Sequence, residues 1–136
     1  MKIDHLLLDN LTAQAKANPR LRQSYDLRTT ANDNSQRMLN AMEPGTVMPI
    51  HRHRNTSETM VMVRGKLIER IYDDTGYLID EFVMEPCGSY PMVQIEVGQW
   101  HSLEVIESGT VIFEAKDGKY IPLVEEDIMN NNCYSN

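Results

Sequence analysis

The sequence of 136 residues lacks most features of secreted, membrane and nucleic-acid-binding proteins. Its two cysteines, Cys87 and Cys133, are far apart and form no CxxC pair, so we expect two free thiols in a reducing compartment. No apolar run approaches the ~20 residues of a membrane span, and the N-terminus lacks the apolar stretch of a signal peptide. With 13 basic residues against 20 acidic ones, the net charge of −7 argues against nucleic-acid binding and against a polybasic membrane patch. We therefore expect a cytoplasmic protein without nucleic-acid or membrane partners.

The pattern of apolar residues predicts a short helix followed by β-structure. Leucine and alanine recur at helical spacing from Leu6 to Ala15, and Asn18-Pro19 ends the run. The stretch 19–35 is polar and is expected to be a loop. From Gln36 onward, short β-like runs alternate with turn residues, and Asp74-Thr75-Gly76 is typical of a hairpin. The runs are RMLNAME, TVMPIHRH, ETMVMVRG, KLIERIYD, YLIDEFVME, MVQIEV, HSLEVIE and TVIFEAK.

These runs predict an all-β sandwich or barrel with an N-terminal helix, in one domain. We expect residues 1–35 to form a helix and loop packed on the barrel. Residues 36–124 would form the barrel itself, and residues 125–136 a C-terminal tail.

The stretch GTVMPIHRHRNTSETMVMVRG, residues 45–65, holds the strongest chemical signal. On a strand His51 and His53 would point to the same face, and paired neutral imidazoles suit a divalent cation. Glu58 follows after a gap long enough for a turn, and would add an anionic ligand. His101, at the start of a later β-like run, is available as a fourth. Two histidines alone are more often plain surface, but the whole pattern G-x5-H-x-H-x4-E-x6-G favours a metal site.

This pattern matches the first motif of the cupin superfamily in identity and spacing, through Gly45 and Gly65 as well as the three ligands. The second cupin motif matches in part. Gly98 and His101 are present, whereas Glu96 and Val105 stand where the family has proline and asparagine. Within the superfamily the sequence resembles the WbuC-type cupin fold metalloproteins, in the stretches SYDLR (24–28), QRMLNAMEPGTVMPIHRH (36–53) and GQWHSLEVIESGTVIFEAKDGKY (98–120).

The resemblance implies a double-stranded β-helix, or jelly-roll barrel, holding one metal ion, and a link to bacterial O-antigen and polysaccharide synthesis. Three imidazoles and a carboxylate suit Zn, Fe, Mn, Ni, Co or Cu, and ligand type does not choose among them. We expect a metal-dependent isomerase or epimerase acting on a sugar or nucleotide-sugar, as a homodimer by analogy. The alternatives are an iron-dependent dioxygenase and a non-catalytic, metal-stabilised module that binds a small molecule.

An isomerase also needs a base that is not a metal ligand. The candidates are Glu114, Tyr90 and Tyr120. In VIFEAK, alternation places Glu114 with Ile112 and Lys116, so its carboxyl is either buried with a raised pKa or paired with Lys116.

Four residues are candidates for substrate binding. Arg37 and Asn40 lie on opposite faces of their expected strand, so at most one would face a cavity. Trp100 could stack on a sugar ring or cap the barrel mouth. Lys116 is the fourth candidate. Met60 and Met62 share the face of Glu58 and would form either a wall beside the metal or plain core.

Overall fold

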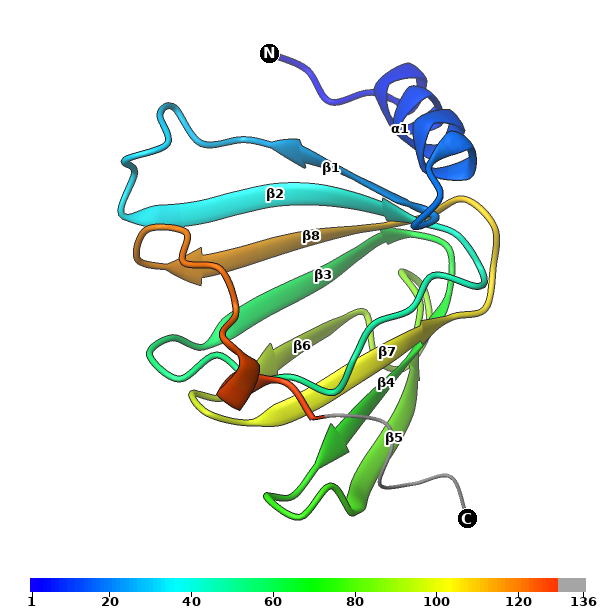
Figure 1. Cartoon of the computed structure of the whole chain (residues 1–136). Helices are drawn as coiled ribbons and strands as arrows, with labels where there is room; N and C mark the ends of the chain where they lie inside the picture. Colours follow the sequence, from blue (N-terminus) through cyan, green and yellow to red (C-terminus); the bar gives the residue numbers. More distant parts are fainter. Residues whose placement is uncertain (130–136) are drawn as a thin grey trace.

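The computed structural model describes residues 1–129, and the chain forms one helix and two antiparallel sheets (Figure 1). The element order is α1 (His5–Ala17), β1 (Arg22–Asp26), β2 (Ser35–Met42), β3 (Glu58–Arg64), β4 (Leu67–Tyr72), β5 (Leu78–Met84), β6 (Met92–Ile95), β7 (Trp100–Val105), β8 (Thr110–Asp117) and the 3-10 turn η1 (Glu125–Asp127).

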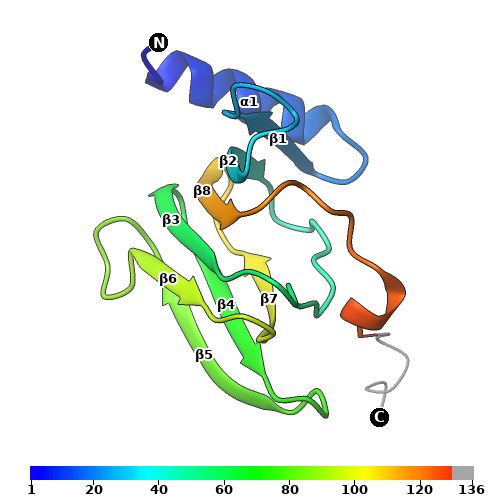
Figure 2. The same cartoon turned by 90° about the vertical axis from the view of Figure 1, so that its left-hand side faces the viewer.

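Helix α1 begins and ends where the sequence predicts. The Asp4 side chain accepts a hydrogen bond from the Leu7 main-chain N–H (3.0 Å) and caps the first turn, and Asn18 is the C-cap. The helix buries Leu8, Leu11 and Ala15 against one face of the larger sheet, with Leu39, Ala41 and Val111. Each buried leucine contributes about 1.5–3 kcal/mol. The helix therefore covers the outer face of this sheet at β1, β2 and β8 (Figure 2).

The two sheets have the strand orders β1-β2-β8-β3-β6 and β5-β4-β7. Alternation along the strands sends a second set of apolar side chains into the space between the sheets. We call the sheet surfaces that face this space the inner faces. The core between them consists of Met42, Met60, Met62, Leu67, Met84, Leu103, Val105 and Ile112. The prediction of an all-β fold with one N-terminal helix is confirmed.

Two local predictions were wrong. Thr46–His53 is not a strand: it is irregular apart from bridges of His51 to His101 and Ile128. Pro49 interrupts the stretch because it has no N–H to donate. Conversely, β1 lies within the expected loop 19–35 and pairs with β2. Its inner-face residues are polar, so the apolar alternation that reveals a half-buried strand is missing.

The expected hairpin is confirmed: the Gly76 N–H donates to the Asp73 carbonyl (3.0 Å), and Gly76 has a φ of +85°. Part of the expected tail packs on the barrel, because the Met129 N–H donates to the Ile50 carbonyl (2.8 Å). Residues 130–136, including Cys133, lie outside the described residues, and Cys87 is an exposed free thiol. Through residue 129, no helix is both long and apolar enough to cross a bilayer.

Candidate metal centre

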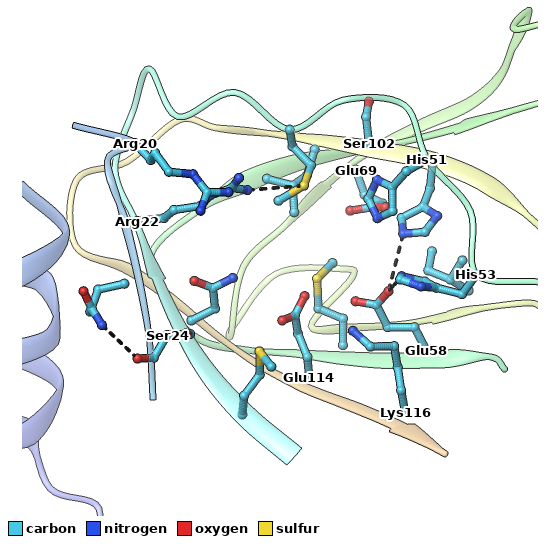
Figure 3. A pocket seen from close by; sticks show the side chains of 18 of the residues that line it. Arg20, Arg22, Ser24, His51, His53, Glu58, Glu69, Ser102, Glu114 and Lys116 are labelled. Atoms are coloured by element: carbon cyan, nitrogen blue, oxygen red, sulfur yellow. Dashed lines mark hydrogen bonds and ion pairs between the residues drawn. The ribbon is translucent and has the colours of Figure 1, made fainter. Parts of the chain in front are cut away.

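The four predicted ligands converge, and Figure 3 shows His51, His53 and Glu58 together at one end of the pocket. One potential ligand atom from each of His51, His53, Glu58 and His101 lies within 4.8 Å of the others. Glu58 opens β3 and His101 lies on β7, so both sheets contribute. The ring centroid of His51 is 5.2 Å from that of His53 and 4.2 Å from that of His101.

Main-chain hydrogen bonds place the irregular histidine segment. The His51 and His101 main chains bond to each other, and the Gly98 N–H donates to the His53 carbonyl (2.8 Å). The intervening arginines turn outward: Nε of Arg52 and of Arg54 both donate to Asp127 Oδ1 (3.0 and 2.6 Å). The H-R-H-R alternation thus sends imidazoles inward and guanidinium groups outward to one buried aspartate.

Two histidines have their tautomer set by carbonyl groups. Nδ1 of His51 lies 2.9 Å from the Pro49 oxygen, and Nδ1 of His101 lies 3.0 Å from the Gln99 oxygen. Since a carbonyl only accepts, each Nδ1 carries a proton, and in the neutral ring Nε2 then presents a lone pair. Burial, followed by the neighbouring His101, lowers the pKa of His51 to about 3. This keeps His51 in the neutral form that binds metals.

Glu58 supplies the negative charge of the cluster. It is 4% exposed, and its Oε2 lies 3.1 Å from His53 Nε2 and 3.4 Å from His101 Nε2. Among the described residues this oxygen is buried without a hydrogen-bond partner. Burial alone would raise the pKa of Glu58, but the contacts with His101 and His53 and the charge of Lys116 hold it well below its usual range. A carboxylate and imidazole nitrogens directed at one point fit a single divalent transition-metal ion.

A cavity of about 380 Å³ opens beside this cluster. Of the predicted catalytic and substrate residues, Glu114, Tyr120, Asn40 and Lys116 line it. Met60 belongs to the core and also lines the cavity, whereas Met62 belongs to the core alone. Glu114 stands between Met38 and Met60 on the neighbouring strands. Burial, followed by the charge of Glu58, raises the pKa of Glu114 to about 8, which Lys116 and Asn40 partly offset.

The structure does not bring the other three candidates to this cavity. Tyr90 is 51% exposed and its ring packs on Phe82 at 5.2 Å. Arg37 lies on the face of β2 opposite to Asn40 and forms an ion pair with Asp33 (3.2 Å). Trp100 points away from the cluster: its indole N–H donates to Asp74 Oδ1 (3.2 Å), and Arg52 lies over its ring.

Three further charged residues line the cavity that the sequence did not indicate: Glu69, Arg20 and Arg22. Glu69 is 0% exposed, and within the described chain neither of its oxygens has a hydrogen-bond partner. Burial, followed by the charges of Glu58 and Glu114, raises the pKa of Glu69 well above its usual range. One signal was available for Glu69. It occupies an inward position between Leu67 and Ile71, where a half-buried strand normally carries an apolar residue.

Residues 3–84 match the family model described as "Domain of unknown function (DUF6016)". The chain belongs to this family. No curated protein matches the sequence.

Solved structures resemble the DUF6016 chain in fold. KdgF from Halomonas sp. has a TM-score of 0.61 at 12% identity, over 76% of this chain and 84% of that one. CapF from Staphylococcus aureus, a capsular polysaccharide assembling protein, has a TM-score of 0.62 at 20% identity, over 82% of this chain and 32% of that one. An oxalate oxidase in complex with glycolate has a TM-score of 0.63 at 14% identity, over 79% and 56%.

These neighbours are cupins, so the predicted cupin jelly-roll is confirmed. The DUF6016 chain spans most of KdgF but about a third of CapF. The fold, together with the cluster of His51, His53, Glu58 and His101, supports a single divalent metal ion as the cofactor.

Proposed function

We propose that this cupin is a metal-dependent isomerase or epimerase acting on a sugar derivative. The observation that carries the proposal is the position of Glu114. It projects from β8 into the cavity that the cluster borders, yet it is not a member of the cluster. A proton-transferring carboxyl and a metal-binding group therefore face the same small molecule.

Each cavity residue has a distinct task in this proposal. A bound divalent ion supplies Lewis-acid polarisation of a substrate carbonyl. Glu114, as its carboxylate, takes a proton from the hydroxyl-bearing carbon next to that carbonyl. In isomerisation it returns this proton to the former carbonyl carbon, while the hydroxyl proton passes to the former carbonyl oxygen. In epimerisation a water molecule protonates the same carbon from the opposite face. Asn40 and Lys116 orient hydroxyl groups, and Tyr120 borders the opening. Tyr90, Arg37 and Trp100 lie off the cavity and take no part.

A sugar substrate has support of two kinds. The sequence resembles the WbuC-type cupins, and CapF, which shares the fold, is a capsular polysaccharide assembling protein. We therefore propose a role in bacterial polysaccharide synthesis, in the cytoplasm. We also propose a homodimer, in which residues 36–124 of each copy form the barrel, residues 1–35 pack on it and residues 125–136 are a C-terminal tail.

The test is exchange of substrate hydrogen with solvent. Protein stripped of metal and reloaded with Mn(II), Zn(II), Ni(II), Co(II) or Fe(II) is incubated in D₂O with hexose phosphates and with keto derivatives of dTDP-, GDP- and UDP-sugars. We expect metal-dependent deuterium incorporation next to a carbonyl. We also expect Glu114→Gln to lower its rate by about 10²–10⁴-fold while retaining metal, whereas exposed Glu104→Gln leaves the rate unchanged.

Two results would contradict the proposal. Absence of deuterium incorporation across all substrates and metals would favour a binding module. Substrate-dependent oxygen uptake by anaerobically loaded Fe(II) protein would favour the dioxygenase alternative.

A further inference from the structure

The cavity has a second polar region, formed by Arg20 and Arg22. The arginines and the metal cluster lie at different levels along the strands. Arg22 is level with Met42 of β2 and, across β2, with Thr110 of β8. Glu58 is level with Lys116, six residues further along β8. At about 3.3 Å per residue, this is about 20 Å of strand between the two levels. Figure 3 shows Arg22 pointing into the cavity from the side opposite to His53 and Glu58.

These two arginines differ from the other six in the chain. Within residues 1–129 each of the six forms an ion pair with aspartate or glutamate: Arg28, Arg37, Arg52, Arg54, Arg64 and Arg70. Arg20 and Arg22 have no carboxylate within ion-pair distance in that part of the chain. Among the described residues, the Arg22 side chain forms one hydrogen bond, to the Met48 sulfur (3.7 Å), which is a weak acceptor.

The positive charges of the two guanidinium groups also repel each other. Partial burial lowers the pKa of Arg22, and the charge of Arg20 lowers it further. Two like charges beside one cavity repel each other, and a bound anion would relieve that repulsion. Glu114 is the acidic residue that acts on Arg22, and it lies in the cavity without forming an ion pair with it.

The chemistry of the pair indicates which anion would fit. Guanidinium groups bind phosphate and carboxylate oxygens through paired N–H donors. A phosphoryl monoester carries between −1.5 and −2 charges at neutral pH, which matches two arginines better than a single carboxylate does.

We propose that Arg20 and Arg22 form a phosphoryl-binding subsite, so that the ligand of this cavity is a phosphorylated sugar. Its phosphoryl group lies at the arginines, and its carbonyl end faces the metal centre. The second half of this inference rests on the proposed isomerase function, whereas the first half concerns anion binding alone.

The first experiment measures anion binding without metal. Metal-free protein is titrated calorimetrically with inorganic phosphate at low ionic strength. We expect Arg22→Gln and Arg20→Gln each to weaken phosphate binding about tenfold or more, because each removes charged hydrogen bonds. Arg70→Gln is the matched control, since Arg70 pairs with Glu81 and Glu104 outside the cavity. Circular dichroism checks that every variant folds. Arg20 is exposed, so its variant keeps the test valid if Arg22→Gln does not fold.

The second experiment separates two sources of the same group. Glucose 6-phosphate and UDP-glucose are compared with glucose, with and without Mn(II). The subsite is supported if either phosphorylated compound binds more tightly than glucose and Arg22→Gln abolishes this difference. The compound that binds more tightly shows whether the ligand is a sugar phosphate or a nucleotide-sugar. The subsite is overturned if Arg22→Gln and Arg70→Gln bind phosphate with equal affinity. It is also overturned if both phosphorylated compounds bind no more tightly than glucose.

The two proposals can fail separately. Arginine-dependent phosphate binding without deuterium exchange leaves the subsite and removes the isomerase. Exchange that persists at unchanged KM in Arg22→Gln leaves the isomerase and removes the subsite.

Discussion

The main chains of His51 and His101 are joined by a reciprocal pair of hydrogen bonds: the His51 N–H donates to the His101 carbonyl (3.0 Å), and the His101 N–H donates to the His51 carbonyl (2.9 Å). This pair connects the irregular segment before β3 to strand β7. It holds two of the imidazoles together through the backbone, independently of any ion. The metal centre is therefore preorganised, and its ligands need no large rearrangement to bind a cation.

We expect removal of the metal to lower stability without unfolding the chain. A ligand at about 1,000 times its Kd adds about 4 kcal/mol, and each kcal/mol changes Tm by about 2–4 °C in a chain of about this size. Dialysis against a chelator should therefore lower Tm by about 10 °C and leave the far-UV circular dichroism unchanged. His53→Ala should reproduce the lower Tm and show no bound metal by elemental analysis, whereas exposed His5→Ala should match the parent chain. A fully loaded His53→Ala protein would rule out the ligand assignment.

Asp127 should control how tightly the centre holds its ion. Its carboxylate binds Arg52 and Arg54, and these contacts orient the segment that carries His51 and His53. Asp127→Asn keeps the size of the side chain but removes its charge. We therefore expect the free energy of unfolding to fall by about 1–3 kcal/mol and metal to be released faster to a chelator. The matched control is Asp26→Asn, which breaks the Arg28 ion pair far from the cluster. Equal release rates for the two variants would show that Asp127 does not position the segment.

The metal ligands could be predicted from the sequence because three of them form a short local motif of characteristic residue types and spacing. His51, His53 and Glu58 come from a stretch of eight residues, and no other residues of the chain repeat that pattern. For Glu114, alternation along one strand left two possibilities open, a buried carboxyl and a pair with Lys116. The packing of β8 between β2 and β3 places it at the cavity. Arg22 could not be found in this way, because its place on the cavity depends on the pairing of β1 with β2, and a polar strand shows no apolar alternation.

Gly65 should be far less tolerant of substitution than Gly98. Both have positive φ, +87° and +76°, which costs about 1–2 kcal/mol for any L-residue. A Cβ at Gly65 would also lie 2.5 Å from the Thr110 Cα, whereas a Cβ at Gly98 meets nothing within 4 Å. We expect Gly65→Ala to lower the free energy of unfolding by about 2–4 kcal/mol and Gly98→Ala by about 1 kcal/mol, as measured by urea denaturation. Equal losses would mean that the turn between β3 and β4 can move away from Thr110.

Glu69 should make the stability of the metal-free chain depend on pH. Because burial raises its pKa in the folded state, the folded chain keeps a proton that the unfolded chain releases above about pH 4.3. The stabilising contribution is therefore complete below that pH and is lost as the pH rises towards the raised pKa. The loss is about 1.4 kcal/mol per pH unit for one proton.

Glu69→Gln cannot titrate. The difference in free energy of unfolding between this variant and the parent chain should therefore shift in favour of the variant from pH 5 to pH 7. Urea denaturation at both pH values measures the gain, and Glu104→Gln, an exposed change on the neighbouring strand β7, should show none. Glu69→Met should stabilise the fold at pH 7 by about 1–3 kcal/mol, because it removes a buried carboxyl that has no partner within residues 1–129. If parent and Glu69→Gln proteins show the same pH dependence, the Glu69 carboxyl is as well solvated in the fold as in the unfolded chain. A buried carboxyl that lowers the stability of the fold is expected where the group contacts a ligand, because functional sites commonly reduce stability.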